Sequence, residues 1–230
     1  MRALRILLVI AVVLGGIFVA VDRAAVHFAE SEAEGRIQFT GAQAGSTDVS
    51  IKGFPFLTQV AGSELDQVNV GLTGIRTNTP EGRTLTISEI RAQLHQVTLG
   101  AGYSSATASR VTGTAVVSYD DLTKAADKDV TVAYGGDGKV KVTGSVAILG
   151  RTVSRSVVST VTLLDGKTVK VHADKVPGED VPGVERLIRR KTDFERRIGG
   201  LPNGMELQKI EATPDGLEIS VTGTDVSLAG

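Results

Sequence analysis

The 230-residue chain contains no cysteine and no tryptophan, and it has only six phenylalanines and three tyrosines. The absence of cysteine excludes disulfides, thiolate metal sites and a cysteine nucleophile. With so few aromatic rings, the hydrophobic share of 41% consists mainly of valine, isoleucine, leucine and alanine. Branched side chains fit a pleated surface, so this composition favours β-structure.

Neither sign of charge is in excess. The chain has 25 basic and 26 acidic residues, which gives a formal net charge of -1. Such a chain has no overall positive field to attract nucleic acid, and we expect no nucleic-acid partner. Charged residues of mixed sign make up 22% of the chain, which argues against a wholly disordered protein.

The sequence also lacks the common catalytic motifs. Its three histidines, His27, His95 and His172, fall in different predicted elements, and none belongs to an H-E-x-x-H motif. There is no G-x-S-x-G elbow, and the acidic residues at 120–121 and 127–129 lack the spacing of a calcium loop. We therefore predict no catalytic residue, no metal and no cofactor, and a protein that is not an enzyme.

An apolar run near the start of the sequence predicts a membrane-inserted helix. The run extends from Ile6 to Val21 without a charged residue, and Arg2 and Arg5 precede it. As a helix it is about 24 Å long, somewhat short of the roughly 30 Å of a bilayer core. Positive residues flank membrane helices on the cytoplasmic side, so the rest of the chain is expected outside the cytoplasm, in the cell envelope.

Two interpretations of this segment stay open. Residues 4–21 either anchor the protein in the plasma membrane or form a signal segment whose cleavage lets the protein be secreted. A cleavage site needs small residues at two spaced positions, and Phe18 is a poor partner for Ala20 in such a site. We favour the anchor, with residues 1–21 as the membrane segment and residues 22–230 as one domain.

Hydrophobic periodicity divides the rest of the chain into helices and strands. Alternation between residues 47 and 176 predicts a meander of antiparallel strands, giving an α+β fold class. In the first predicted helix Val26 and Ala29 lie on the apolar face, and Glu30 and Glu34 are expected to face elsewhere. The predicted helices cover residues 22–38, 120–126 and 184–198, and two final strands cover residues 205–212 and 217–221.

Glycines inside the strand pattern bear on the shape of the sheet. Gly71, Gly74 and Gly113 interrupt runs of strand residues, and such positions commonly hold kinks that let a long sheet curl. A curled sheet around amphipathic helices would enclose an elongated apolar interior that few aromatic rings are available to fill. The alternative, a fully packed core with glycine in turns, stays open at this point.

A phenylalanine-rich segment stands out at residues 53–59, with the sequence G-F-P-F-L-T-Q. It places Phe54, Phe56 and Leu57 around a proline directly after a predicted strand. Two interpretations remain: a core plug at a strand bend, or an exposed apolar tip for membrane contact.

Basic residues cluster in the predicted helix 184–198. A solvated helix face is the ordinary explanation, and contact with anionic lipid headgroups is the sharper one. The candidate headgroup residues are Arg186, Arg189, Arg190 and Lys191.

Several segments together resemble a known family. They are Val49 to Gln59, Gly200 to Leu207 (G-L-P-N-G-M-E-L), Thr213 to Leu217 (T-P-D-G-L) and Val221 to Val226 (V-T-G-T-D-V). In this order they are similar to the LmeA-like phospholipid-binding proteins of actinobacteria, and the resemblance covers nearly all of the chain after the apolar run.

The resemblance implies a fold and a function. The fold would be a long curved antiparallel sheet wrapped around amphipathic helices, like half of a tubular lipid-binding (TULIP, BPI-like) module, preceded by the apolar helix. The function would be phospholipid binding in the cell envelope, with a role in lipid transport or lipoglycan assembly. Phospholipid and membrane are therefore the expected partners, and no protein partner is indicated.

Combined with the strand pattern, this resemblance predicts an apolar tunnel that holds acyl chains. The residues expected to line it or its lip are Phe54, Phe56, Leu57, Val68, Val70, Leu72, Leu94, Val132, Val142, Leu187 and Phe194. Two other functions stay open: a membrane-anchored scaffold with a solid interior, and, as a distant third, a glycan-modifying enzyme with two facing carboxylates.

Overall fold

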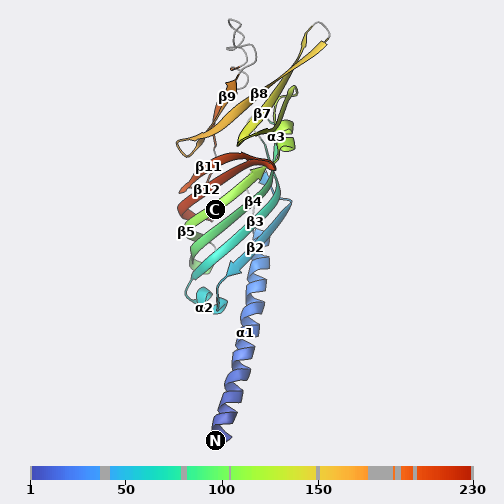
Figure 1. The fold of residues 1–230 in the computed structure, drawn as a ribbon. Coiled ribbons are helices and arrows are strands. Elements are labelled where there is room, and N and C mark those ends of the chain that lie inside the picture. Colours follow the sequence, from blue (N-terminus) through green and yellow to red (C-terminus); the bar gives the residue numbers. More distant parts are fainter. Residues whose placement is uncertain are drawn as a thin grey trace.

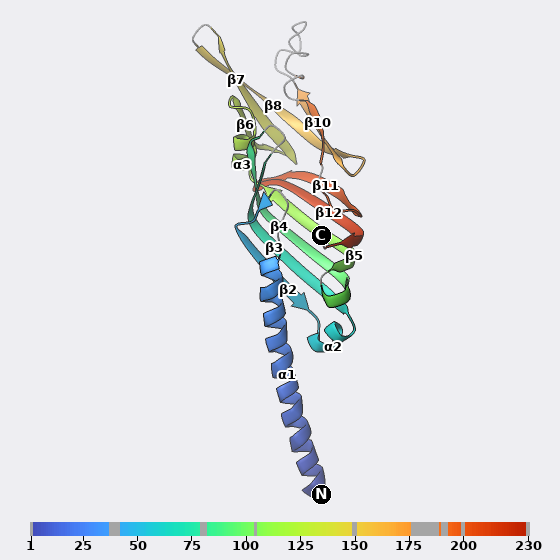
Figure 2. The ribbon, with the colours of Figure 1, turned by 180° about the vertical axis from the view of Figure 1, so that it is seen from behind.

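One long helix and two antiparallel sheets make up the computed structural model of the chain (Figures 1 and 2). Short helical segments also connect strands in the described part of the chain, namely α2 (Phe56–Ala61), the 3-10 turn η1 (Ala101–Tyr103) and α3 (Tyr119–Ala125). The structure describes residues 2–36, 42–78, 82–103, 105–148, 151–175, 189, 193–198 and 201–228.

Helix α1 (Arg2–Arg36) is continuous, although the sequence was expected to form an apolar segment and a separate amphipathic helix. No proline lies in this stretch, so nothing interrupts the helical hydrogen bonds between the two parts. The apolar half is exposed along its length, with Leu4 70% and Leu7 66% accessible. Among the described residues, Leu4–Gly35 is the one stretch long and apolar enough to cross a membrane.

The second half of α1 is bound to the edge of a sheet. Strand β2 (Ser46–Lys52) pairs with one neighbour, β3 (Glu64–Asn78), which leaves amides on its other edge. The Oε1 atoms of Glu30 and Glu34 accept hydrogen bonds from the amides of Ile51, at 2.7 Å, and Val49, at 3.1 Å. Both glutamates therefore lie off the apolar side of the helix, as expected, and they face an edge strand whose donors they satisfy.

We expect Glu30→Ala to weaken this attachment. The Ile51 amide would lose its acceptor, at a cost of about 1 kcal/mol in the free energy of unfolding, and its hydrogen exchange would become faster. Glu30→Gln keeps an acceptor oxygen at the same place and should leave the exchange rate of this amide nearly unchanged. Equal rates in both variants would show that the contact does not protect the strand.

The first sheet has one apolar and one polar face. Its strand order is β1-β3-β4-β5-β12-β11, with β2 also paired to β3. The remaining strands of this sheet are β1 (Ala42–Gln43), β4 (Thr84–Leu99), β5 (Ala106–Val117), β11 (Met205–Thr213) and β12 (Gly216–Ser227). Paired residues share a face, so the row Val68, Leu94, Val111 is apolar and the next row, Asn69, Gln93, Thr112, is polar.

The second sheet packs over one end of this apolar face. Its strands, in order, are β10 (Phe194–Arg197), β9 (Thr168–Lys175), β8 (Arg151–Leu164), β7 (Lys139–Ile148) and β6 (Val130–Gly136). A buried cluster joins the two sheets, from Val140, Val161, Val169 and Val171 on one side to Leu207 and Ala212 of β11 on the other. The first sheet itself is curved and unclosed (Figure 1).

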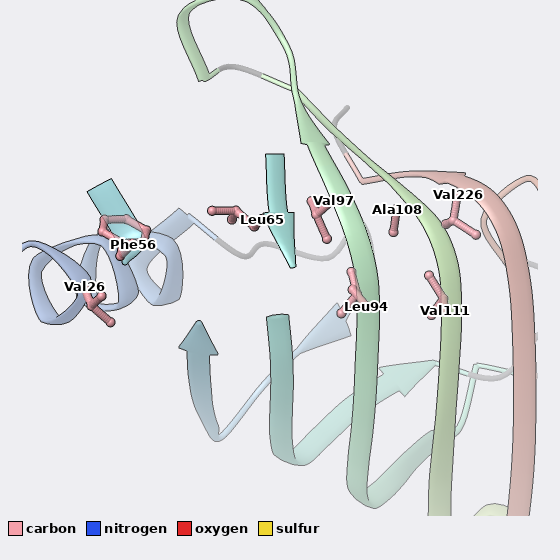
Figure 3. Close-up of a cluster of buried hydrophobic side chains, with 8 residues drawn as sticks. All are labelled: Val26, Phe56, Leu65, Leu94, Val97, Ala108, Val111 and Val226. Atoms are coloured by element: carbon pink, nitrogen blue, oxygen red, sulfur yellow. The ribbon is translucent and has the colours of Figure 1, made fainter. Parts of the chain in front are cut away.

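The other end of the apolar face is covered by the two helices. Figure 3 shows Val26 of α1 and Phe56 of α2 beside strand residues of β3, β4, β5 and β12. The cluster consists of Val26, Phe56, Leu65, Leu94, Val97, Ala108, Val111 and Val226. In β4, Leu94 and Val97 are three residues apart and both are buried here, because Gln96 between them has a positive φ of 51° and shifts the alternation.

Several predicted elements are confirmed and one is wrong. The helix expected at 120–126 is α3, and Ser118 caps it by accepting a hydrogen bond from the amide of Asp121. The two final strands are β11 and β12. The helix expected over 184–198 is wrong at its end, where residues 194–197 form strand β10 along the edge of β9 (Figure 2); Arg189 is helical, and residues 184–188 and 190–192 lie outside the described residues. Pairing with an open sheet edge outweighs the helix propensity of its glutamate and arginines.

A charged pair in the second sheet predicts a dependence of stability on pH. Hydrogen bonds from Lys139, at 2.5 Å, and Thr160, at 2.6 Å, lower the pKa of Asp174. A lowered pKa in the folded state stabilises the fold above the unfolded-state value of about 3.9, and this contribution is lost as the pH falls through the folded value. We expect Asp174→Asn to reduce the free energy of unfolding at pH 7 and to have a smaller effect near pH 3, where part of this contribution is already lost. An equal loss at both pH values, measured by urea unfolding, would contradict this assignment.

Candidate functional site

A strip of small and apolar residues lies between the two covers of the first sheet. Val70, Ala92, Gly113 and Val221 are paired in register across β3, β4, β5 and β12, so they share the apolar face. All four are half-buried. We call this row the apolar strip.

The side chains of the apolar strip are smaller than those of the row beside it. On one side it is flanked by the row Val68, Leu94 and Val111, and the middle of the strip holds only alanine and glycine. A Cβ atom on Gly113 would lie 3.0 Å from the carbonyl oxygen of Arg91 and 3.2 Å from a methyl group of Val221. Glycine therefore lets the strands approach closely at this point, and no side chain rises from it.

Four of the predicted lining residues lie together on this face. Val68 and Val70 pack against the helix-covered cluster, Leu94 belongs to it, and Leu72 is buried further along β3. Val132 and Val142 lie on the second sheet and pack against the cluster that joins the sheets. Leu187 and the side chain of Phe194 lie outside the described residues. The structure thus brings the predicted residues to two ends of one apolar face.

The predicted headgroup residues are mostly beyond what the structure describes. Arg186, Arg190 and Lys191 lie outside the described residues. Arg189 donates a hydrogen bond of 2.8 Å from Nη1 to the carbonyl oxygen of Ala173. Its Nη1 also lies 3.6 Å from a carboxylate oxygen of Asp193, so this guanidinium binds the edge of β9.

The phenylalanine-rich segment forms a corner around α2, at residues 53–62, which we call the α2 corner. Gly53 has a φ of 101°, and a Cβ atom there would lie 2.5 Å from Nε2 of Gln59. Gln59 accepts a hydrogen bond from the amide of Asp66, which ties the corner to β3. Thr58 donates to the carbonyl oxygen of Pro55 at 2.8 Å. Most residues of this segment therefore stabilise the conformation of the α2 corner.

The two central phenylalanines of this corner have different environments. Phe56 is 6% exposed and fills the helix-covered cluster, whereas Phe54 is 57% exposed. Leu57 is half-buried and packs against the same cluster as Phe56. Phe56 is therefore a core plug and Phe54 is an exposed apolar side chain, while membrane contact by this segment stays a prediction.

Asp22 is a residue that the sequence interpretation missed. It follows the apolar run directly, and its side chain is fully buried. Its Oδ1 accepts a hydrogen bond of 2.9 Å from the amide of Leu57, in the first turn of α2. Pro55 caps α2 without a side-chain hydrogen bond, so Asp22 supplies the acceptor from another helix. An acidic residue right after an apolar run was the only signal in the sequence.

A hollow away from the apolar strip is lined mainly by charged and polar residues. It has a volume of about 550 Å³ and is lined by Arg83, Thr123, Lys124, Ala126, Asp127, Lys128, Val130 and Thr131. Arg83 and Asp127 form an ion pair of 2.8 Å in it. None of the predicted lining residues is part of this hollow. In the described part of the chain, no group of three or more histidine, cysteine or acidic residues is arranged to hold a metal ion.

Comparison with known proteins identifies the family. No curated protein and no solved structure matches the chain. The family described as LmeA-like phospholipid-binding matches residues 20–222. The match begins at the end of the apolar run and covers both sheets, which confirms the resemblance seen in the sequence and the curved α+β fold that it implied. The chain therefore belongs to the LmeA-like phospholipid-binding family.

Proposed function

We propose that this protein binds a phospholipid by laying an acyl chain along the apolar strip, between the cover formed by α1 and α2 and the cover formed by the second sheet. The observation that supports it is the half-buried row Val70, Ala92, Gly113, Val221, which joins the helix-covered cluster to the cluster between the sheets. Each methylene moved from water to such a surface contributes about 0.8 kcal/mol, so an acyl chain of ordinary length supplies most of the affinity.

The proposal includes the cellular setting. Helix α1 anchors the protein in the plasma membrane, and residues 22–230 act as one domain outside the cytoplasm. There the protein carries or presents phospholipid for transport within the envelope or for lipoglycan assembly. No step of chemistry is assigned to it, since the family is described by lipid binding rather than by a reaction.

Photo-crosslinking tests the proposal and separates bound lipid from lipid that merely surrounds α1. The full chain is reconstituted into phosphatidylglycerol vesicles that contain a trace of phospholipid with a diazirine in its acyl chain. After irradiation, mass spectrometry locates the crosslinked residues. We expect crosslinks on β3, β4 and β5 beside the apolar strip in addition to those on α1. Crosslinks confined to α1 would overturn lipid binding by the domain and favour the scaffold.

A further inference from the structure

The apolar run and the α2 corner meet at one level of the molecule. The apolar run ends at Val21, and the next residue, Asp22, holds the amide of Leu57 in α2 through its carboxylate. The pictures agree on this arrangement: α2 lies at the end of the domain from which the apolar part of α1 emerges (Figures 1 and 2). If α1 spans a bilayer with its apolar run in the hydrocarbon, the α2 corner lies in the adjoining headgroup layer.

The helix is held to the domain along the thirteen residues from Asp22 to Glu34, so the corner has little freedom to turn away. Asp22 binds α2, and Glu30 and Glu34 bind the amides of β2. In a helix, four residues advance about 6 Å, and two residues of a strand advance about 6.6 Å, so the two glutamates match alternate amides. Three carboxylate contacts in a row make α1 a rigid support rather than a flexible tether.

Phe54 has the surroundings of a membrane-interface residue. Its ring is 57% exposed, whereas Phe56, two residues later, is buried. The guanidinium carbon of Arg23 lies 5.2 Å from the centre of this ring, and Arg23 also donates to Asp22 at 2.5 Å. An exposed ring beside a cation suits the boundary between acyl chains and anionic headgroups, where an apolar body and a charged tip are both accommodated.

We infer that the α2 corner is a second membrane contact: Phe54 inserts into the surface of the same phospholipid bilayer that α1 spans, with Arg23 at the headgroups. Two points of attachment fix the tilt of the domain, and with it the orientation of the apolar strip toward the bilayer from which a lipid would enter. The inference rests on the proposed function in one respect only, the insertion of α1.

The absence of native cysteine allows a direct test with single-cysteine variants of the full chain. Ala61→Cys places a label on the exposed last turn of α2, and Asp215→Cys places one in the turn between β11 and β12. The labelled proteins are reconstituted into vesicles of phosphatidylcholine and phosphatidylglycerol that contain lipid spin-labelled near the headgroup. We expect strong quenching of the fluorophore at position 61 and little at position 215. Equal quenching at the two positions would overturn the contact without any further substitution.

A charge substitution then tests whether the Phe54 ring makes the membrane contact detected at position 61. Phe54→Glu should lower the quenching at position 61, because a carboxylate does not enter the acyl-chain boundary, and α1 should still keep this quenching above that of position 215. Val158→Glu, which also replaces an exposed apolar side chain but on the second sheet, should leave it unchanged. Undiminished quenching with Phe54→Glu would overturn the role of the ring. Quenching that persists when crosslinks to the apolar strip are absent would instead refute the proposed function and leave this contact standing.

Discussion

Ala92→Phe is expected to abolish acyl-chain binding by a folded protein. Ala92 lies in the middle of the apolar strip, between Val70 and Gly113, and is half-buried. A phenyl ring there would occupy the space above the glycine and displace the lipid. Each displaced methylene costs about 0.8 kcal/mol, so excluding only two of them weakens binding about tenfold. Crosslinking to β3, β4 and β5 should fall by at least this factor.

The neighbouring residue provides a matched control. Gln93 follows Ala92 on the same strand but lies on the polar face, exposed to solvent. Gln93→Phe adds the same ring to the same strand and should leave the crosslinks on the apolar strip unchanged. Undiminished crosslinking with Ala92→Phe, or equal loss with both substitutions, would refute the strip as the acyl-chain site. Circular dichroism of both variants shows whether the sheets are retained.

The strands were predictable because their pattern is local. Val68, Val70 and Leu72 alternate with polar residues, and this period of two identifies a strand with one buried face. The pairing of distant strands leaves no such pattern: Val221 of β12 lies opposite Gly113 of β5, more than a hundred residues away. The sequence therefore indicated an apolar face but not which residues form a row across it.

The composition of the site explains why its centre was not predicted. Lining residues were expected to be large aliphatic side chains in a strand pattern, and Val70 and Leu94 fit this description. Ala92 and Gly113 are too small to be recognised in this way. Their small side chains nevertheless leave less volume filled on the apolar face between the two covers. The apolar tunnel stays a prediction; the described residues show an unclosed sheet whose apolar face is covered at both ends.

Polar contacts between distant elements were missed for a different reason. Helical periodicity placed Glu30 and Glu34 off the apolar side of the helix and indicated no partner for either carboxylate. The edge of β2 presents amides that need acceptors, and this requirement exists only once the strand has been placed beside the helix. The same holds for Asp22, whose partner Leu57 lies 35 residues later in the chain.

A pair of substitutions in the α2 corner should have strongly unequal effects on stability. Phe56 is 6% exposed, in the cluster with Val26 and Leu65, so Phe56→Ala leaves a cavity and should lower the free energy of unfolding by about 3–5 kcal/mol. Phe54 is 57% exposed, and Phe54→Ala should change the same quantity by no more than about 0.5 kcal/mol. Urea unfolding of both variants in detergent, followed by circular dichroism, measures the difference.

The same pair also separates folding from membrane contact. Phe56→Ala removes the packing that holds α2 against α1 and the sheet, whereas Phe54→Ala removes a side chain that contributes to the fold mainly through Arg23. A protein with alanine at position 54 should therefore be as stable as the original chain and still show weaker quenching of a label at position 61 by headgroup-labelled lipid. A large loss of stability with Phe54→Ala would instead mean that its ring supports the fold, and its exposure would then no longer argue for insertion into a bilayer.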